Sequence, residues 1–175
     1  STVPAYLFSD LWENSRAAGA EIRRLIQPTS AVTMFLLTWG RQRGLGPDEF
    51  FTEFTQMQEY LNTGLQLYQR AAMNPRSFVA PAGVAFQLIY DDTIAAGGTA
   101  ASSPFSDLYS GDGSHPDVQG TYLSACVIYA AYTGRSVAEL EWAPNGIDAE
   151  RRDYLQSKAD EAVFDDDTFA PSRWE

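Results

Sequence analysis

Hydrophobic positions along this chain follow two patterns, short continuous runs and spacings of three or four residues. Residues 31–39, AVTMFLLTW, form a continuous and largely apolar run, which is typical of a strand buried on both faces of a parallel sheet. Residues 78–80 form a second, shorter strand candidate. The segments around these runs have helical spacing, so the pattern predicts strands and helices that alternate.

Start and stop signals give the expected bounds of the helices. Ser9 or Asp10 can cap a first helix, which Pro28 ends. The second helix is expected to begin at Pro47, with acidic residues beside it, and to stop at Asn74-Pro75. Further helices are expected over residues 81–94, 116–133 and 148–164.

The helical spacing also gives the apolar sides of the predicted helices. The first helix places Leu11, Ala18, Ile22 and Leu25 on one apolar face. The helix over 116–133 is apolar nearly all round, which predicts burial on most sides. The second helix has the clearest amphipathic pattern, and its expected core positions are Phe50, Phe54, Met57, Leu61, Leu65, Tyr68 and Ala72.

Alternating strands and helices predict an α/β fold, with a parallel sheet between two layers of helices. Two strands are too few to bury five helices, however. Either further strands lack a recognisable pattern, or a segment outside this chain completes the sheet. The small residues of 95–103 are expected to form a surface loop within one domain.

Length and charge narrow the function classes. A chain of 175 residues suits a single domain. A net charge of −11 argues against nucleic acid and against an anionic membrane surface as partners. No stretch approaches the roughly 20 apolar residues of a membrane span. The single cysteine, Cys126, excludes an internal disulfide and a cysteine-based zinc site; no metal or cofactor is expected, and the compartment stays unassigned.

The clearest catalytic candidates lie in the segment LYSGDGSHP. His115 is the single histidine of the chain, and Asp112 precedes it by three residues in a Gly-rich loop. An aspartate at that spacing can accept a hydrogen bond from the imidazole Nδ1–H, which leaves Nε2 free to take a proton from a hydroxyl. With Pro116 as the first helical residue, the helix dipole would keep the imidazole neutral. A turn-forming Asp112 and a structural His115 are the alternatives.

Residues 112–136 resemble the last motif block of the SGNH (GDSL-type) hydrolases, in which Asp-x-x-His-Pro precedes a Gly-x-Tyr-Leu-x-Ala helix. The segment LTWGR over 37–41 and the segment VAPAGVAF over 79–86 resemble a branch of the same superfamily. The helix over 147–164 is similar to the closing helix of the family. The resemblance implies a three-layer α/β/α fold of the flavodoxin-like SGNH type.

The Ser, Gly and Asn blocks of that family, which carry the nucleophile and the oxyanion hole, are absent from this chain. Ser9-Asp10 and residues 111–114, GDGS, contain residue types of the block that carries the nucleophile, but neither segment is assigned that role. The resemblance therefore implies that residues 1–165 are the C-terminal part of one SGNH-like domain, followed by an acidic tail over 166–175. An upstream fragment of the same protein, or a partner chain, is expected to complete the sheet.

The function implied by the resemblance is the hydrolysis of small esters, with acetylated carbohydrates as the expected substrates. Asp112 and His115 would form the acid–base pair, and Trp39, Arg41 and Tyr109 are candidates for contacts with substrate. Each of these three has an ordinary structural alternative, as a core, salt-bridged or packed loop residue. The alternative function is a catalytically inactive SGNH-like subunit with a structural or interaction role in a larger assembly.

Overall fold

A computed structural model describes residues 9–45, 50–72, 77–166 and 169 of the chain. Strand β1 (Thr33–Leu36) pairs in parallel with strand β2 (Ser77–Ala80), with Thr33 opposite Ser77 and Leu36 opposite Ala80. In this part of the chain the sheet contains these two strands, and one edge of β1 has no neighbour. The predicted α/β class and the parallel pairing are therefore confirmed in this small sheet.

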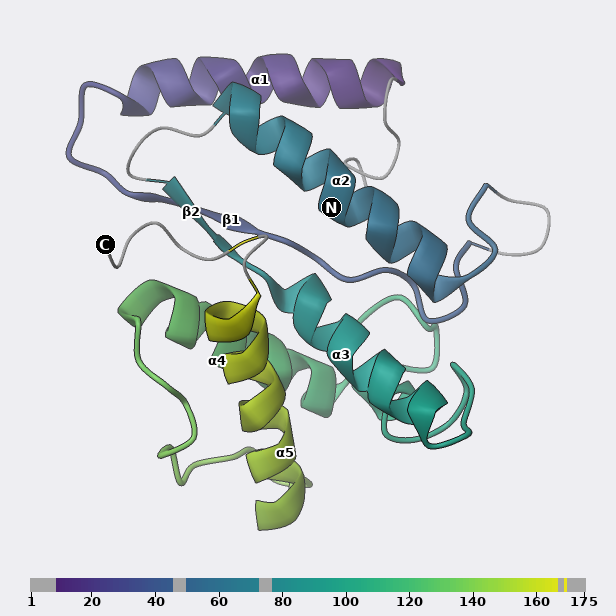
Figure 1. Ribbon diagram of the computed structural model, residues 1–175. Helices are drawn as coiled ribbons and strands as arrows, with labels where there is room; N and C mark the ends of the chain where they lie inside the picture. The colour runs from purple at the N-terminus through teal and green to yellow at the C-terminus, as the bar shows by residue number, and fades with distance from the viewer. Residues whose placement is uncertain (1–8, 46–49, 73–76, 167–168, 170–175) are drawn as a thin grey trace.

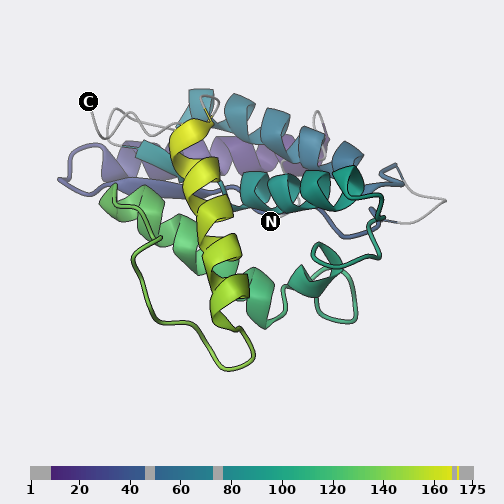
Figure 2. The same cartoon turned by 60° about the horizontal axis from the view of Figure 1, so that its bottom comes forward.

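The helices follow the predicted order and are distributed on both sides of the strands. In Figure 1, α1 and α2 lie above the strands, while α4 and α5 lie below them. Figure 2 shows α5 lying across α4, with α3 beside them. The bounds are α1 Asp10–Ile26, α2 Phe54–Ala72, α3 Ala82–Ala95, η2 Ser106–Leu108, α4 Val118–Thr133, α5 Ala149–Asp160 and the π-helical turn η3 Glu161–Asp165.

The hydrophobic core lies around β2 and helices α3 and α4. Every residue of β2 is buried, as expected for a strand covered on both faces. Both helices are apolar on several sides, which fits their position between other elements. Fully buried side chains of these helices include Phe86, Ile89, Leu123 and Val127, each of which stabilises the fold by about 1.5–3 kcal/mol through burial.

The start of α2 differs from the prediction. Pro47 lies outside the described residues, and the helix begins only at Phe54. The Phe51 carbonyl accepts a hydrogen bond from the Leu45 N–H, so this segment closes the preceding loop instead of continuing the helix. Phe51 is consequently buried, while Phe50, expected in the core, is 68% exposed. Phe54 and Met57 are buried as predicted.

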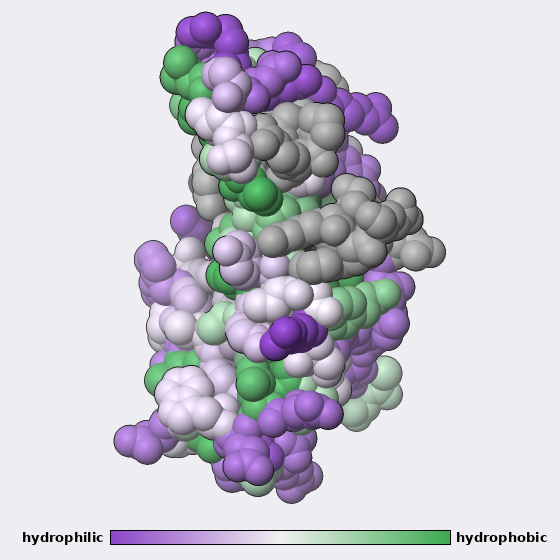
Figure 3. Space-filling model, turned by 90° about the vertical axis from the view of Figure 1, so that its left-hand side faces the viewer, coloured by the Kyte–Doolittle hydropathy of each residue, from purple (hydrophilic) through white to green (hydrophobic). Residues whose placement is uncertain are grey.

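The apolar stripe predicted for α1 does not face the core of this chain. The helix packs against α2 through Trp12 and Gly19, whereas Leu11, Ile22 and Leu25 are each more than half exposed. Apolar residues are visible at the surface near the top of the molecule in Figure 3, where α1 lies. An amphipathic stripe shows that a helix has one apolar side, but it does not show whether this chain covers that side.

Strand β1 also exposes apolar residues. Its burial alternates, with Phe35 packed edge-on against Tyr68 of α2 and with Met34 and Leu36 36% and 42% exposed. Strands of parallel sheets are normally covered on both faces. The predicted run over 31–39 therefore has the composition of a buried strand, but one face of β1 is open. No helix among the described residues is long and apolar enough to cross a membrane.

Candidate active site

A tight turn between η2 and α4 holds the two predicted catalytic residues. One carboxylate oxygen of Asp112, Oδ1, accepts hydrogen bonds from the backbone N–H groups of Ser114 and His115 at 2.8 and 2.9 Å and from the Ser110 hydroxyl at 2.8 Å. Gly113 has a φ of 64°, a left-handed conformation that glycine adopts without strain. The turn leaves the second oxygen, Oδ2, to the imidazole.

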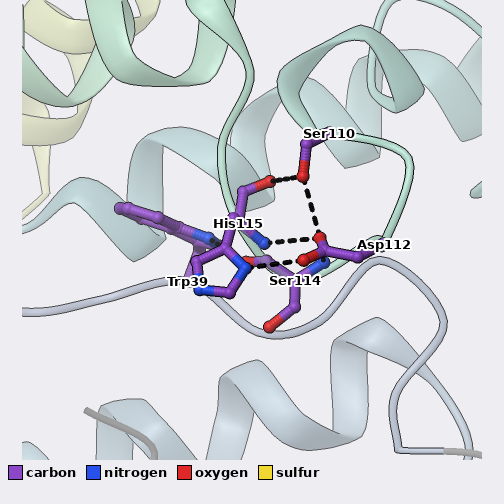
Figure 4. A network of polar contacts seen from close by, with 5 residues as sticks. All are labelled: Trp39, Ser110, Asp112, Ser114 and His115. Atoms are coloured by element: carbon purple, nitrogen blue, oxygen red, sulfur yellow. Dashed lines mark hydrogen bonds and ion pairs between the residues drawn. The ribbon is translucent and has the colours of Figure 1, made fainter.

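The side chains of Asp112 and His115 form a hydrogen-bonded pair, called the dyad below. Asp112 Oδ2 lies 2.6 Å from His115 Nδ1, and Figure 4 shows the carboxylate pointing toward the imidazole ring. The His115 contact is the main reason that the pKa of Asp112 lies well below its usual range, and the N–H groups of His115 and Ser114 and the Ser110 hydroxyl lower it further. The carboxylate is therefore ionised at neutral pH and selects the tautomer with hydrogen on Nδ1.

The other imidazole nitrogen, Nε2, is in position to act as a base. The His115 side chain is 80% exposed, and none of the described residues hydrogen-bonds to Nε2. An oriented neutral imidazole of this kind takes a proton from a hydroxyl and returns it to a leaving group. The predicted orientation of His115 by Asp112 is thus present in the structure, whereas the catalytic role stays a prediction.

Among the described residues, no hydroxyl or thiol is hydrogen-bonded to the imidazole Nε2. Ser110 donates its hydroxyl to Asp112 and to the His115 carbonyl oxygen. Cys126 is buried in α4, and burial raises the pKa of its thiol to about 11, which keeps it protonated and unreactive at neutral pH. The described residues also contain no group of side chains suited to a metal ion.

Helix α4 begins two residues later than predicted. Asp117 is its N-cap and accepts a hydrogen bond from the Val118 N–H at 2.7 Å, so Pro116 precedes the helix. The backbone N–H of Asp117 donates to the Leu108 carbonyl, which ties the turn to η2. Asp117 is one of the residues that favour N-cap positions, and this signal outweighs the proline. His115 consequently lies before the cap and not within the first helical turn.

Two predicted pocket residues, Trp39 and Tyr109, link the loop that follows β1 to the segment that carries the turn. Trp39 stacks on Phe86 with ring centres 4.7 Å apart, and its indole Nε1–H donates to the Ser114 carbonyl at 3.2 Å. Tyr109 is 6% exposed and donates its hydroxyl to the Gly40 carbonyl at 2.7 Å. Each side chain thus holds a backbone carbonyl near the dyad, and its contact with substrate stays a prediction.

Arg41, the third predicted pocket residue, lines a cavity beside the dyad. This cavity, of about 280 Å³, lies between the loop after β1 and the Asp112 turn. Arg43 and Gln42 share its lining, and sequence reasoning did not single them out. Glycines at 40 and 44 flank these residues directly after a predicted strand, and this was the available signal, since ligands of open α/β sheets bind at the carboxyl ends of strands.

Gln58 is a second residue that the sequence did not reveal. It is fully buried on α2, where it accepts a hydrogen bond from the Gly40 N–H at 2.8 Å and donates to Asn62. A glutamine beside Met57 on the inward side of an amphipathic helix was the available signal, because buried amides require partners. Gln58 thus fixes the start of the loop that carries Arg41.

Replacing Gly83 with alanine is expected to destabilise the protein by about 1–3 kcal/mol. A Cβ at this position would lie far inside van der Waals contact with the Thr38 carbonyl oxygen and the Gln58 amide. Thermal unfolding should show a melting temperature lower by roughly 2–12 °C. Gly111→Ala is the control, because its Cβ would meet no atom within 4 Å; equal melting temperatures for the two variants would contradict this packing.

Comparison with known proteins gives a structural relative. No protein-family model matches the chain, and none of the curated proteins matches it. Among solved structures, the fold is similar to the crystal structure of a DUF4886 family protein from Bacteroides uniformis, with a TM-score of 0.71 and 20% sequence identity. The similarity covers 93% of this chain and 59% of that one. At this identity the likeness shows a shared fold, and this chain spans little more than half of the length of its relative.

Proposed function

We propose that this chain is the C-terminal part of an SGNH-type serine esterase, to which it contributes the acid–base pair. The observation that carries the proposal is the 2.6 Å contact between Asp112 and His115 Nδ1. The His115 side chain is also exposed, and no described residue hydrogen-bonds to its Nε2. A purely structural histidine would have no need of an oriented ring whose second nitrogen faces solvent.

The proposed reaction is the hydrolysis of small esters, with acetylated carbohydrates as the expected substrates. A serine from a segment outside this chain attacks the ester carbonyl while His115 Nε2 accepts its proton. Asp112 stabilises the imidazolium that forms, and His115 then protonates the leaving alcohol. Water releases the acyl group from the serine with the same residue as base, and donors in the outside segment hold the oxyanion.

The same segment is proposed to complete a three-layer, flavodoxin-like domain. A further parallel strand would pair with the open edge of β1, and covering elements would bury Met34 and Leu36. The relative of known structure supports this proposal, since 41% of its length lies outside the match. The expected tail over 166–175 falls mostly outside the described residues; Phe169, which is described, is buried.

Turnover of 4-nitrophenyl acetate by the intact protein tests the proposal. The intact protein should hydrolyse the ester, while the 175 residues alone, which lack an assigned nucleophile, should not. An intact protein with no activity toward acetyl esters would instead support the inactive structural or interaction subunit.

A further inference from the structure

A polar cavity adjoins the dyad on the side of the loop that follows β1. It encloses about 280 Å³. Asp112 is part of its wall, so a group bound there would lie next to the ester that His115 acts on. The lining residues are Arg41, Gln42, Arg43, Gly44, Leu45, Gly111, Asp112 and Gly113.

Hydrogen bonds fix the two loops that enclose this cavity. The Gln42 N–H donates to the Gly113 carbonyl at 2.8 Å, and the Gln42 side chain donates to the Ala100 carbonyl at 2.7 Å. Gly44 has a φ of 67° and packs so closely on the backbone of Phe51 that no larger residue fits there. These contacts hold the backbone of both loops in place, so a ligand would not have to order that backbone.

The charges of the cavity favour an anion. Arg41 and Arg43 are exposed, and in the part of the chain that the structure describes neither forms an ion pair with a carboxylate. Asp112 is the acidic residue of the lining, but its carboxylate already accepts hydrogen bonds from Ser110, Ser114 and His115. Among the described residues, two guanidinium groups are therefore available to an anion, in a protein whose net charge is −11.

We propose that this cavity binds a carboxylate on the alcohol part of the ester substrate. The inference rests on the proposed esterase function and names its substrate class, an acyl ester of an acidic alcohol such as an acidic sugar. The acyl group of the proposed substrates is small and carries no charged group, so the carboxylate belongs to the alcohol. The planar fork of arginine matches a carboxylate, with two parallel hydrogen bonds.

A matched pair of esters tests this preference in the intact protein. 4-Acetoxybenzoate and 4-acetoxybenzamide share the acetyl group and the ring, and differ in the charge of the distal group. The double variant Arg41→Gln, Arg43→Gln should lower the ratio of kcat/KM for the anionic over the neutral ester roughly twofold to thirtyfold, the range for two exposed ion pairs. An unchanged ratio would overturn the proposal.

The control removes an arginine that lies far from the cavity. Arg135 is exposed beyond the C-terminal end of α4, and this helix of 16 residues separates it from the dyad by about 24 Å. Arg135→Gln makes the same charge change per site and should leave the ratio at its original value. A fall as large as that of the double variant would assign the effect to net charge and would also overturn the proposal.

Binding of the products separates this inference from the esterase proposal. Nuclear magnetic resonance titration with 4-hydroxybenzoate should shift the amide signals of residues 41–45 and 111–113, more strongly than 4-hydroxybenzamide does and only with both arginines present. These shifts without any turnover would support the anion site and reject the esterase. Turnover with equal binding of the two compounds would reject the anion site alone.

Discussion

Replacing His115 with alanine in the intact protein is expected to lower kcat/KM for 4-nitrophenyl acetate by about 10⁴-fold or more. His115 is the single histidine of the chain, and its Nε2 is the proposed acceptor of the serine proton. Without it, the nucleophile has no base and the leaving alcohol has no acid. Steady-state kinetics of the two proteins measure the loss directly.

Stability provides the control for this variant. The His115 side chain is 80% exposed, so its removal should change the free energy of unfolding by no more than about 0.5 kcal/mol. An inactive variant with an unchanged melting temperature would therefore have lost chemistry and not structure. A variant that keeps most of its activity would show that His115 is not the base.

Asp112→Asn separates the two roles of the aspartate. An asparagine oxygen can still accept the backbone hydrogen bonds that Ser114 and His115 donate to Oδ1. Its amide N–H₂ would then face Nδ1 and select the tautomer with hydrogen on Nε2. In that tautomer Nε2 cannot accept the proton of the serine. The expected fall in kcat is about 10⁴-fold with little change in stability.

Leu36→Asp is expected to destabilise the intact protein by more than about 3 kcal/mol. Leu36 lies on the open face of β1 and is 42% exposed in this chain. If a further segment covers that face, the substitution buries a carboxylate without a partner. In the 175 residues alone, the same substitution leaves the carboxylate in contact with water and should cost much less.

Chemical denaturation of both proteins measures this difference. Leu140→Asp is the matched control, because Leu140 is 38% exposed and lies between α4 and α5, away from β1. The Leu140 variant should lose similar stability in the intact protein and in the shorter chain. An equally small effect of Leu36→Asp in both proteins would show that the face of β1 stays open.

The dyad was predictable because all the groups that build it lie between Ser110 and His115. A glycine-rich turn, an aspartate and a histidine three residues later define the local geometry without any distant partner. The strands and the helices after β2 were predictable for a similar reason, since their apolar patterns are strong and their ends carry caps or breakers.

Features that depend on distant contacts were not predictable. Trp39 supports the turn through the Ser114 carbonyl, and Gln58 supports the loop through the Gly40 N–H. Neither the apolar runs of the strands nor the helical spacing of apolar residues reveals such pairs. The inward side of α1 was missed because its apolar stripe is exposed in this chain, and the start of α2 was missed because Phe51 closes a loop.

Mapping the site that a fluorophosphonate probe labels in the intact protein tests the central proposal most directly. Such probes react with a serine that a neighbouring histidine activates. Mass spectrometry of the digested protein should place the label on a serine outside these 175 residues, and His115→Ala should abolish the labelling. No label in the intact protein, or a label that persists in the His115→Ala variant, would contradict the proposal that this chain supplies the acid–base pair of a serine esterase.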